Sequence, residues 1–152
     1  MIEHTAGNCA RRERLGILAR ADAGALMQIW QKLCIEPECQ LIRGPETGLV
    51  TLRGRTGGGG AAFNFGEATV SRATVKLADG AIGHAVVLGR DHAKVKLAAL
   101  IDALCHNPEM AERIEQAVIA PLRGQIIHDD NCRRAQAAAT KVEFFTLVRG
   151  ED

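Results

Sequence analysis

Arginine and glycine are concentrated in one segment, from Arg43 to Arg72, and both residue types can bind anions. Guanidinium groups donate paired hydrogen bonds to phosphate or carboxylate, and glycine lets backbone N–H groups approach an anion closely. Four arginines against two glutamates give the segment a charge of +2, in a chain whose formal net charge is +1. The candidate contact residues, to an anion or to a protein partner, are Arg53, Gly54, Arg55, Gly57, Gly58, Asn64, Glu67 and Arg72.

The four consecutive glycines that begin at Gly57 do not match a familiar nucleotide-binding loop. A P-loop places Gly-Lys-Ser/Thr after its glycines, and this segment lacks that sequence. A dinucleotide-binding loop joins a strand to a helix, whereas here a strand is expected to follow. The sequence therefore favours an extended loop whose backbone contacts a partner, with a phosphate site as the alternative.

Other candidates for catalysis are weaker. Glu46 and Glu67 are of the right type for an acid–base pair, but no periodicity places them together, and each is expected to pair with a neighbouring arginine. Ser71 is the one serine in the chain and lacks the Gly-x-Ser-x-Gly elbow of hydrolases. His84 is expected to be a structural residue on a strand face. The remaining candidates, expected near helix ends, are His92, His106 and His128.

Five cysteines with irregular spacing argue against a disulfide framework and for a reducing cytoplasm. They form no Cys-x-x-Cys pair, and no His-x-x-x-His pair occurs, so the usual zinc-binding spacings are absent. We expect no metal site and free thiols that are buried as small apolar groups.

Composition narrows the class of protein. With 152 residues, 47% of them hydrophobic and 24% charged, the chain is expected to be one globular domain over residues 1–152. The near-zero net charge excludes a general nucleic-acid binder. The sequence contains no apolar run of about 18 residues, and its first residues carry an acid rather than an apolar signal segment. A cytoplasmic protein without a membrane partner is therefore expected.

The hydrophobic pattern predicts an α+β fold. Residues 10–35 are predicted to be helical, divided into two helices near Asp22 and Gly24, and stopped by Pro37. Residues 40–90 are predicted to be strands, with 49–55 as a short strand and 68–77 and 82–88 as an antiparallel hairpin. Residues 91–139 are predicted to be helices, begun by an Asp91 cap and interrupted near Pro121. Val142–Val148 is a further predicted strand of the same sheet.

Long strings of this sequence resemble the PhnG family, whose members are small subunits of the bacterial carbon–phosphorus lyase system. The central string runs from Pro45-Glu46-Thr47-Gly48-Leu49-Val50-Thr51-Leu52-Arg53-Gly54-Arg55 through the glycines to Phe63-Asn64-Phe65-Gly66-Glu67-Ala68-Thr69-Val70-Ser71-Arg72. Further matching strings are Gly83-His84-Ala85, Leu88-Gly89-Arg90-Asp91, 97–104 and 139–152. The similarity covers nearly the whole chain, and the first ~10 residues resemble the family least.

The resemblance implies an accessory role in cytoplasmic alkylphosphonate catabolism. It implies a two-fold symmetric core complex with PhnH, PhnI and PhnJ. Together with PhnL, the PhnG, PhnH and PhnI proteins support the reaction of ATP with methylphosphonate to form α-D-ribose 1-methylphosphonate 5-triphosphate. It implies no cofactor in this subunit, since the iron–sulfur cluster and S-adenosylmethionine belong to PhnJ, and no catalytic residue can be carried over.

Three hypotheses for the unusual residues follow. In the first, Arg53, Arg55, Arg72 and the glycines form part of the interface with PhnI. In the second, the same residues bind the triphosphate or phosphonate directly as part of an active site. In the third, the isolated chain forms a homodimer through Val142–Val148, whose Phe144 and Phe145 point to opposite faces of the predicted strand.

Overall fold

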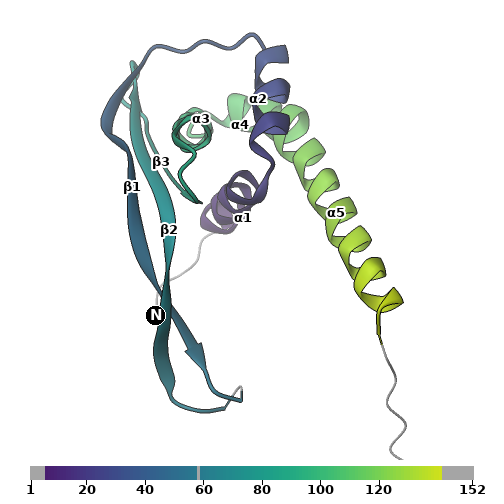
Figure 1. The fold of residues 1–152 in the computed structure, drawn as a ribbon. Coiled ribbons are helices and arrows are strands. Elements are labelled where there is room, and N and C mark those ends of the chain that lie inside the picture. The colour runs from purple at the N-terminus through teal and green to yellow at the C-terminus, as the bar shows by residue number, and fades with distance from the viewer. Residues whose placement is uncertain (1–5, 58, 142–152) are drawn as a thin grey trace, which may run out of the picture.

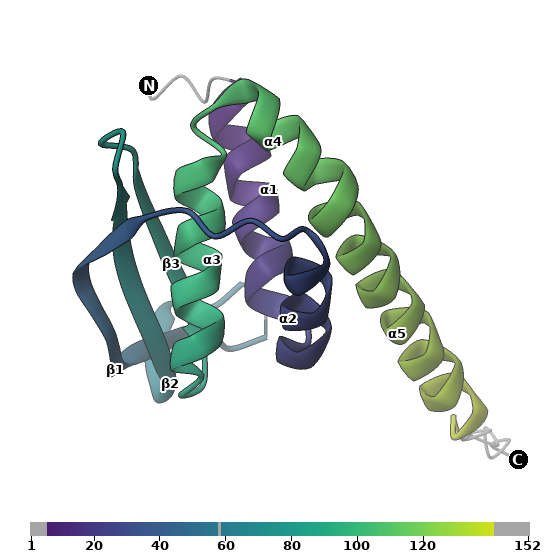
Figure 2. The same cartoon turned by 90° about the horizontal axis from the view of Figure 1, so that it is seen from above.

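The computed structural model describes residues 6–57 and 59–141, and it has two layers. One layer is a three-stranded antiparallel sheet with the order β1-β2-β3. All the described helices lie on one side of this sheet, with α3 directly against it and α5 farthest away, and in the described residues the other face has no helix on it (Figures 1 and 2). The elements are α1 (Ala6–Arg20), α2 (Ala23–Lys32), β1 (Cys39–Arg55), β2 (Ala62–Leu77), β3 (Ile82–Leu88), α3 (His92–Leu104), α4 (Pro108–Ile114), the π-helical turn η1 (Glu115–Ile119) and α5 (Ala120–Ala139).

The predicted α+β class and the division of the N-terminal helical region are confirmed. Asp22 begins α2, because its carboxylate accepts a hydrogen bond of 2.9 Å from the backbone N–H of Ala25. Helix α2 ends at Lys32, some residues before Pro37. The buried Lys94 of α3 holds the junction between α1 and α2 against α3, since its ammonium donates to the carbonyls of Ala19 and Ala21 at 2.8 and 2.6 Å. Burial lowers the pKa of Lys94.

The predicted hairpin is confirmed, with β2 and β3 joined by a tight turn at 78–80. Side chains of β2 alternate as expected, so that Ala73, Val75 and Leu77 are buried under the helices. The prediction for β1 was too short, because this strand has 17 residues and begins at Cys39. Its base is irregular: extra residues interrupt the pairing with β2 on both sides of Arg43, and Gly44 has a φ of +65°.

Helix α3 lies directly on the sheet, and glycine makes this approach possible. Asp91 caps α3 as predicted, by accepting a 2.8 Å hydrogen bond from the N–H of Lys94. At Gly83 in β3, a Cβ atom would meet the carbonyl oxygen of Ala99 and the backbone nitrogen of Ala103. Both are backbone atoms of α3, so they cannot turn aside as the end of a side chain could.

A buried carboxylate ties three elements together beside this contact. Asp102 of α3 is 1% exposed and accepts hydrogen bonds from Arg11 of α1 through Nε at 2.9 Å and Nη2 at 2.6 Å. The same carboxylate accepts a 2.9 Å hydrogen bond from the backbone N–H of His84 in β3. These hydrogen bonds offset the free-energy cost of burying the Asp102 carboxylate, and one of them also satisfies a backbone donor of the edge strand β3.

The C-terminal helical region contradicts one prediction. Instead of an interruption near Pro121, the helix continues from α4 through η1 into α5. The wider π turn comes directly before α5, and Pro121 lies in the first turn of α5, where its missing N–H costs little. The helical prediction for the alanine-rich residues 133–139 is confirmed. The predicted strand Val142–Val148 lies outside the described residues.

The expectation of buried thiols is wrong for most of the cysteines. Cys105 is half-buried behind α3, and the four exposed cysteines are Cys9, Cys34, Cys39 and Cys132. Cys9 and Cys132 lie on exposed helix surfaces, Cys34 lies in the turn after α2, and Cys39 begins the edge strand β1, so none of the four reaches the core. Among the described helices, none has the length and apolar character needed to cross a membrane.

We predict that Gly83→Ala destabilises the fold by about 1–3 kcal/mol, because the added methyl group forces α3 away from β3. Urea unfolding measures the change. Gly48→Ala is the matched control in the same sheet, since a Cβ atom there meets nothing within 4 Å. Equal unfolding midpoints for the two variants would contradict the close approach of α3.

We predict that Asp102→Asn lowers the free energy of unfolding by about 2 kcal/mol, because it removes the charge that Arg11 and the His84 N–H share. Asp130→Asn is the control, since its ion pair with Arg20 is exposed and contributes less than about 0.5 kcal/mol. A thermal melt in which the two variants match would show that Asp102 has no special role.

Candidate functional site

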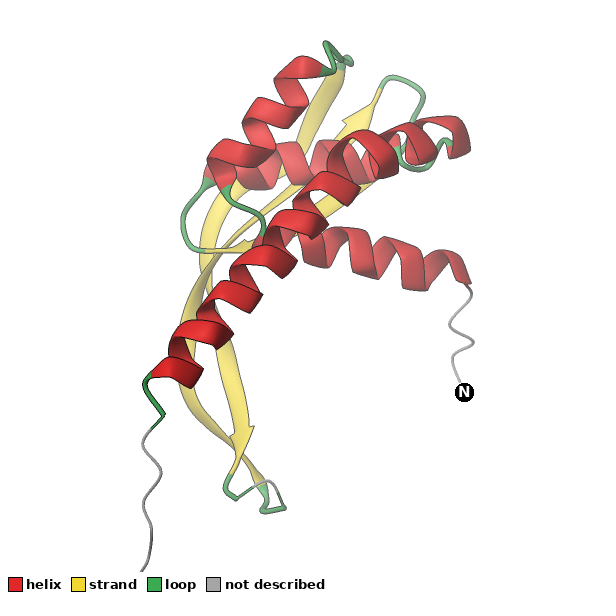
Figure 3. Cartoon of the chain, turned by 90° about the vertical axis from the view of Figure 1, so that its right-hand side faces the viewer, coloured by secondary structure: helices red, strands yellow, loops and turns green. Residues whose placement is uncertain are grey.

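The most prominent feature of the described residues is a two-stranded arm. Strand β3 pairs with β2 only from Val70 to Lys76, whereas the β1–β2 ladder continues beyond it to Arg55 and Ala62. We name residues 49–69 the arm. It projects past β3 and past the ends of the helices that pack on the sheet (Figures 1 and 3). The arm lies entirely within the arginine- and glycine-rich segment from Arg43 to Arg72.

Glycine shapes the tip of the arm. Gly57 has a φ of +61°, a conformation that other residues seldom adopt. The N–H of Gly60 donates to the carbonyl of Thr56 at 3.1 Å, and a Cβ atom on Gly60 would meet that oxygen at 2.8 Å. Arg55 donates through Nη1 to the carbonyl of Gly60 at 3.2 Å. Gly58, one of the predicted contact residues, lies outside the described residues.

One face of the arm is apolar. The rings of Phe63 and Phe65 meet edge to face with centroids 6.2 Å apart. The ring of Phe65 lies over Gly54, where a Cβ atom would be 3.1 Å from it, so these three residues share a face. Alternation along β1 adds Val50 and Leu52 to the same side. We name Val50, Leu52, Phe63 and Phe65 the apolar face, and all four side chains are exposed.

The opposite face of the arm is polar and cationic. Arg53 lies directly opposite Asn64 in the ladder, and Arg55 lies opposite Ala62. Both arginines flank Gly54, so they point away from the phenylalanine rings. Glu67 is opposite Thr51 and joins this side by the same alternation. We name Arg53, Arg55, Asn64 and Glu67 the arginine face; these four predicted residues are brought together.

Arg72 is not part of this group. It lies in β2 beyond the arm, opposite Glu46 of β1. The Oε1 atom of Glu46 accepts hydrogen bonds of 2.6 Å from both Arg72 and Arg43. The hydrogen bonds from Arg72 and then Arg43 lower the pKa of Glu46. Glu46 therefore pairs with arginines as expected, and it is five ladder positions, or about 17 Å, from the level of Glu67. The structure thus rules out these two glutamates as an acid–base pair.

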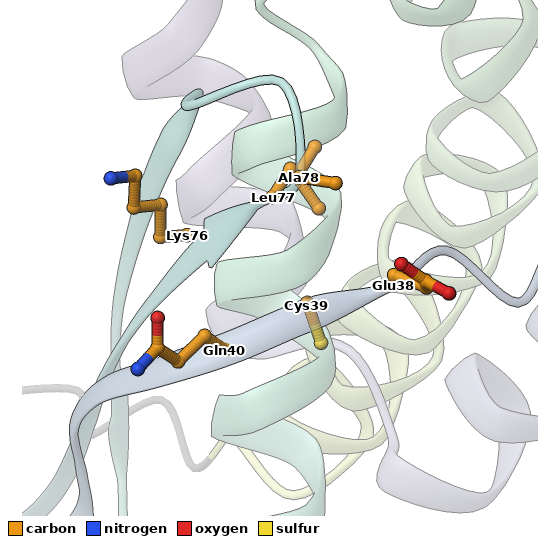
Figure 4. Close-up of a pocket in the computed structure, with 6 residues that line it drawn as sticks. All are labelled: Glu38, Cys39, Gln40, Lys76, Leu77 and Ala78. Carbon is orange, nitrogen blue, oxygen red and sulfur yellow. The ribbon is translucent and has the colours of Figure 1, made fainter.

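Two hollows adjoin the strands, and neither has the form of an enclosed catalytic pocket. One, of 610 Å³, is lined by Arg53, Gly54, Arg55 and Ala62 on the arm. Another, of 390 Å³, lies where the first residues of β1 pair with the last of β2 (Figure 4). It is lined by Glu38, Cys39, Gln40, Lys76, Leu77 and Ala78, whose polar groups do not converge on a common point (Figure 4).

The hydroxyl and imidazole candidates serve the fold. Ser71 is fully buried and its hydroxyl donates to the carbonyl of Gly89 at 2.8 Å. His92 contacts the Thr47 hydroxyl at 2.8 Å and so links α3 to β1. His84 contacts Thr74 through Nδ1 at 3.0 Å on the uncovered face of the sheet, consistent with the expected structural role.

The prediction that His128 lies near a helix end is wrong, because it lies in the middle of α5. Its Nε2 is 3.6 Å from the sulfur of Cys132, one turn later. In the part of the chain that the structure describes, no group of three or more His, Cys, Asp or Glu side chains is placed to hold a metal ion. These residues therefore add no catalytic centre to the arm.

Sequence reasoning missed the apolar face. It treated 62–67 as part of a loop, although Phe63-Asn64-Phe65 already alternates apolar and polar residues as a strand does. It also could not assign faces, because an extra residue of β2 near Phe65 shifts the register between Leu52 and Arg53. The alternation and the aromatic pair were the available signals.

Comparison with known proteins agrees with the resemblance seen in the sequence. The family model described as "Phosphonate metabolism protein PhnG" matches residues 9–150. The chain is also similar to a protein of Rhizobium meliloti (strain 1021) named alpha-D-ribose 1-methylphosphonate 5-triphosphate synthase subunit PhnG. The two are 47% identical over 147 residues, which are 97% of this chain and 94% of the relative. The relative's name describes it as a subunit, and thus as part of a larger assembly.

The half-buried thiol of Cys105, at the C-terminal end of α3, can be tested for nucleophilic reactivity. Burial raises its pKa from 9.0 to about 11, only partly opposed by Arg14. Because a raised pKa keeps a thiol protonated to higher pH, only about 1% of Cys105 is thiolate at pH 9. We predict that iodoacetamide at pH 9 modifies Cys105 after the exposed Cys34 and Cys132, as followed by peptide mass spectrometry. Modification of Cys105 first would indicate an activated nucleophile.

Proposed function

The chain belongs to the PhnG family of phosphonate metabolism proteins, and from this premise we propose that it is an accessory subunit of an α-D-ribose 1-methylphosphonate 5-triphosphate synthase. In this role it contributes to phosphonate catabolism by holding the synthase together, and the catalytic groups lie on other subunits. Its own contribution is the arm, which attaches it to the assembly.

The observation that carries this proposal is the exposure of the arm on both faces. A two-stranded ribbon without a third strand or a covering helix is marginally stable in water. Here it exposes Phe65 by 60% and Leu49, on the other side, by 64%. Protein surfaces seldom leave several large apolar side chains together in water, as the apolar face does, unless a partner covers them. The arm is therefore suited to insertion between partner subunits.

We take the partners to be PhnH, PhnI and PhnJ, with PhnL joining for the synthase reaction. ATP and methylphosphonate are then substrates of the assembly rather than ligands of this chain. The iron–sulfur cluster and S-adenosylmethionine belong to PhnJ, and the assembly acts in the cytoplasm. The lack of convergent catalytic side chains among the described residues is in keeping with an accessory part.

One observation favours a second function, in which the chain binds ATP or the phosphonate directly. Arg53 and Arg55 form no ion pair within the described residues, and both line the 610 Å³ hollow on the arm. Uncompensated guanidinium groups attract phosphate as well as carboxylate. Two side chains on one open ribbon do not, however, surround a phosphate, so this function is the weaker candidate.

We predict that shortening the arm abolishes assembly and leaves the fold intact. In the variant, Asn-Gly replaces residues 52–66 and connects Thr51 to Glu67, which are opposite each other in the ladder. The chain is co-expressed with PhnH, PhnI and PhnJ, and the mass of the purified assembly is measured. We expect the shortened chain to melt cooperatively but to be absent from the assembly.

Ile127→Ser, an exposed apolar position on α5 away from the arm, is the control and should assemble normally. An assembly that retains the shortened chain would contradict the role of the arm. Calorimetric titration of the isolated chain with ATP tests the second function: heat that disappears in Arg53→Ala would support direct nucleotide binding, and no heat would exclude it.

A further inference from the structure

We propose that the arm is gripped from both sides by a partner subunit that offers an apolar groove to one face and carboxylates to the other. The inference rests on the proposed function and specifies the chemistry of the partner. It divides the arm into two working surfaces: the apolar face provides most of the affinity, and the arginine face fixes the orientation through charge.

The apolar face is part of a larger uncovered surface. Gly48, Val70 and Leu88 lie across the ladder from one another, and Val50 follows Gly48 on the same side. The apolar face therefore continues from the arm onto the uncovered side of the sheet, opposite the helices. Most of the large apolar side chains that the described residues expose lie on this surface: Val50, Leu52, Phe63, Phe65, Ile82, Val86 and Leu88. The part that runs from the arm to Leu88 and Val86 is typical of an interface, whereas His84 and Thr74 separate Ile82 from it.

The aromatic pair gives the apolar face its centre. Phe65 and Phe63 support each other edge to face, and Gly54 lets the ring of Phe65 lie on the backbone. The two rings therefore present one joined apolar surface to a groove that receives them. Aromatic anchors held in this way commonly carry a large share of the binding energy of an interface.

The arginine face calls for a partner of opposite charge. The arginines at the base, Arg43 and Arg72, share the carboxylate of Glu46. Arg53 and Arg55 form no comparable ion pair in the described residues, and Glu67 at the edge of their face leaves it one positive charge in excess. The backbone positions of Arg53 and Arg55, two residues apart on a strand, are about 7 Å from each other, so the two guanidinium groups can pair with two separate carboxylates.

A protein partner fits both faces better than a phosphate ligand does. A phosphate could neutralise the arginines but would leave the phenylalanines in water on the other side of the ribbon. A subunit that encloses the ribbon satisfies both faces at once. Carboxylates on such a subunit would speed association and set register, and their effect would weaken as salt screens it.

The test measures the affinity of this chain for the PhnH–PhnI–PhnJ assembly at 50 and 500 mM NaCl. Phe63→Ala/Phe65→Ala removes the aromatic anchors, and Arg53→Gln/Arg55→Gln removes the charges. Ile127→Ala and Arg133→Gln/Arg134→Gln, all on α5, are the matched controls. Thermal melts verify that each variant is folded, which their exposed positions favour.

We expect the phenylalanine variant to bind at least about 10-fold more weakly at both salt concentrations. We expect the arginine variant to bind about 3- to 10-fold more weakly at 50 mM NaCl and almost normally at 500 mM, because screening has already removed its contribution. Both control variants should match the unmodified chain.

Normal binding by the phenylalanine variant, or an arginine variant that keeps the full salt dependence, would overturn the inference while leaving the accessory role intact. So would tripolyphosphate that strengthens binding of the unmodified chain but not of the arginine variant, since the arginines would then serve a phosphate. A dimer of the isolated chain that the phenylalanine substitutions dissociate would instead assign the apolar face to a second copy. Failure of the unmodified chain to join the assembly would overturn both the inference and the proposed function.

Discussion

The seating of α3 on β3, held by the buried carboxylate of Asp102, is the contact on which the rest of the structure depends. A carboxylate can remain in such a place only if donors surround it, and Arg11 and the His84 N–H supply them from two other elements. Gly83 beside it lets the backbones come within contact distance. Because α1 and α3 are fixed on the same side of the sheet, the buried residues of β2 and β3 face that side with the exception of Val70, and the opposite face has no helix on it in the described residues. The same carboxylate also occupies a donor on the β3 edge, which leaves the long β1 strand as the more accessible edge.

The asymmetry explains how a small chain can present a large exposed surface, which we propose as its interaction surface. The core uses only the part of the sheet in which β3 pairs with β2 and α3 covers it. Beyond Val70 the β1–β2 ladder has no third strand and no helix over it, so its side chains are exposed on both faces. An isolated ribbon of this kind gains little free energy from burial and relies on its partner for stability. The features that look unfavourable in the isolated chain, exposed phenylalanines and unpaired arginines, are those that an assembled interface uses.

Local signals allowed much of the fold to be predicted from the sequence. The Asp22 and Asp91 caps, the turn at 78–80 and the alternation in β2 each depend on neighbouring residues alone. What could not be predicted depends on distant residues: the Asp102 contacts span 91 positions to Arg11, and the close approach at Gly83 becomes visible only when α3 is in place. The interruption expected at Pro121 failed because a π turn accommodates the proline. Of the site residues, Arg53, Arg55, Asn64 and Glu67 share a face, whereas Arg72 pairs with Glu46 outside the arm. The bulge near Phe65 brings Asn64 to the same face as Glu67, and the spacing of residues alone could not locate that bulge.

Hydrogen–deuterium exchange of the chain alone and in complex with the proposed partners PhnH, PhnI and PhnJ tests whether the arm is the element by which this subunit joins an assembly. The ribbon has few contacts to hold it closed in isolation, so its amides should exchange quickly there. If the arm is the attachment element, amides of residues 49–69 become strongly protected on assembly, with little change in α3, which is already buried in the isolated chain. Exchange in the arm that is equally fast before and after assembly would contradict it.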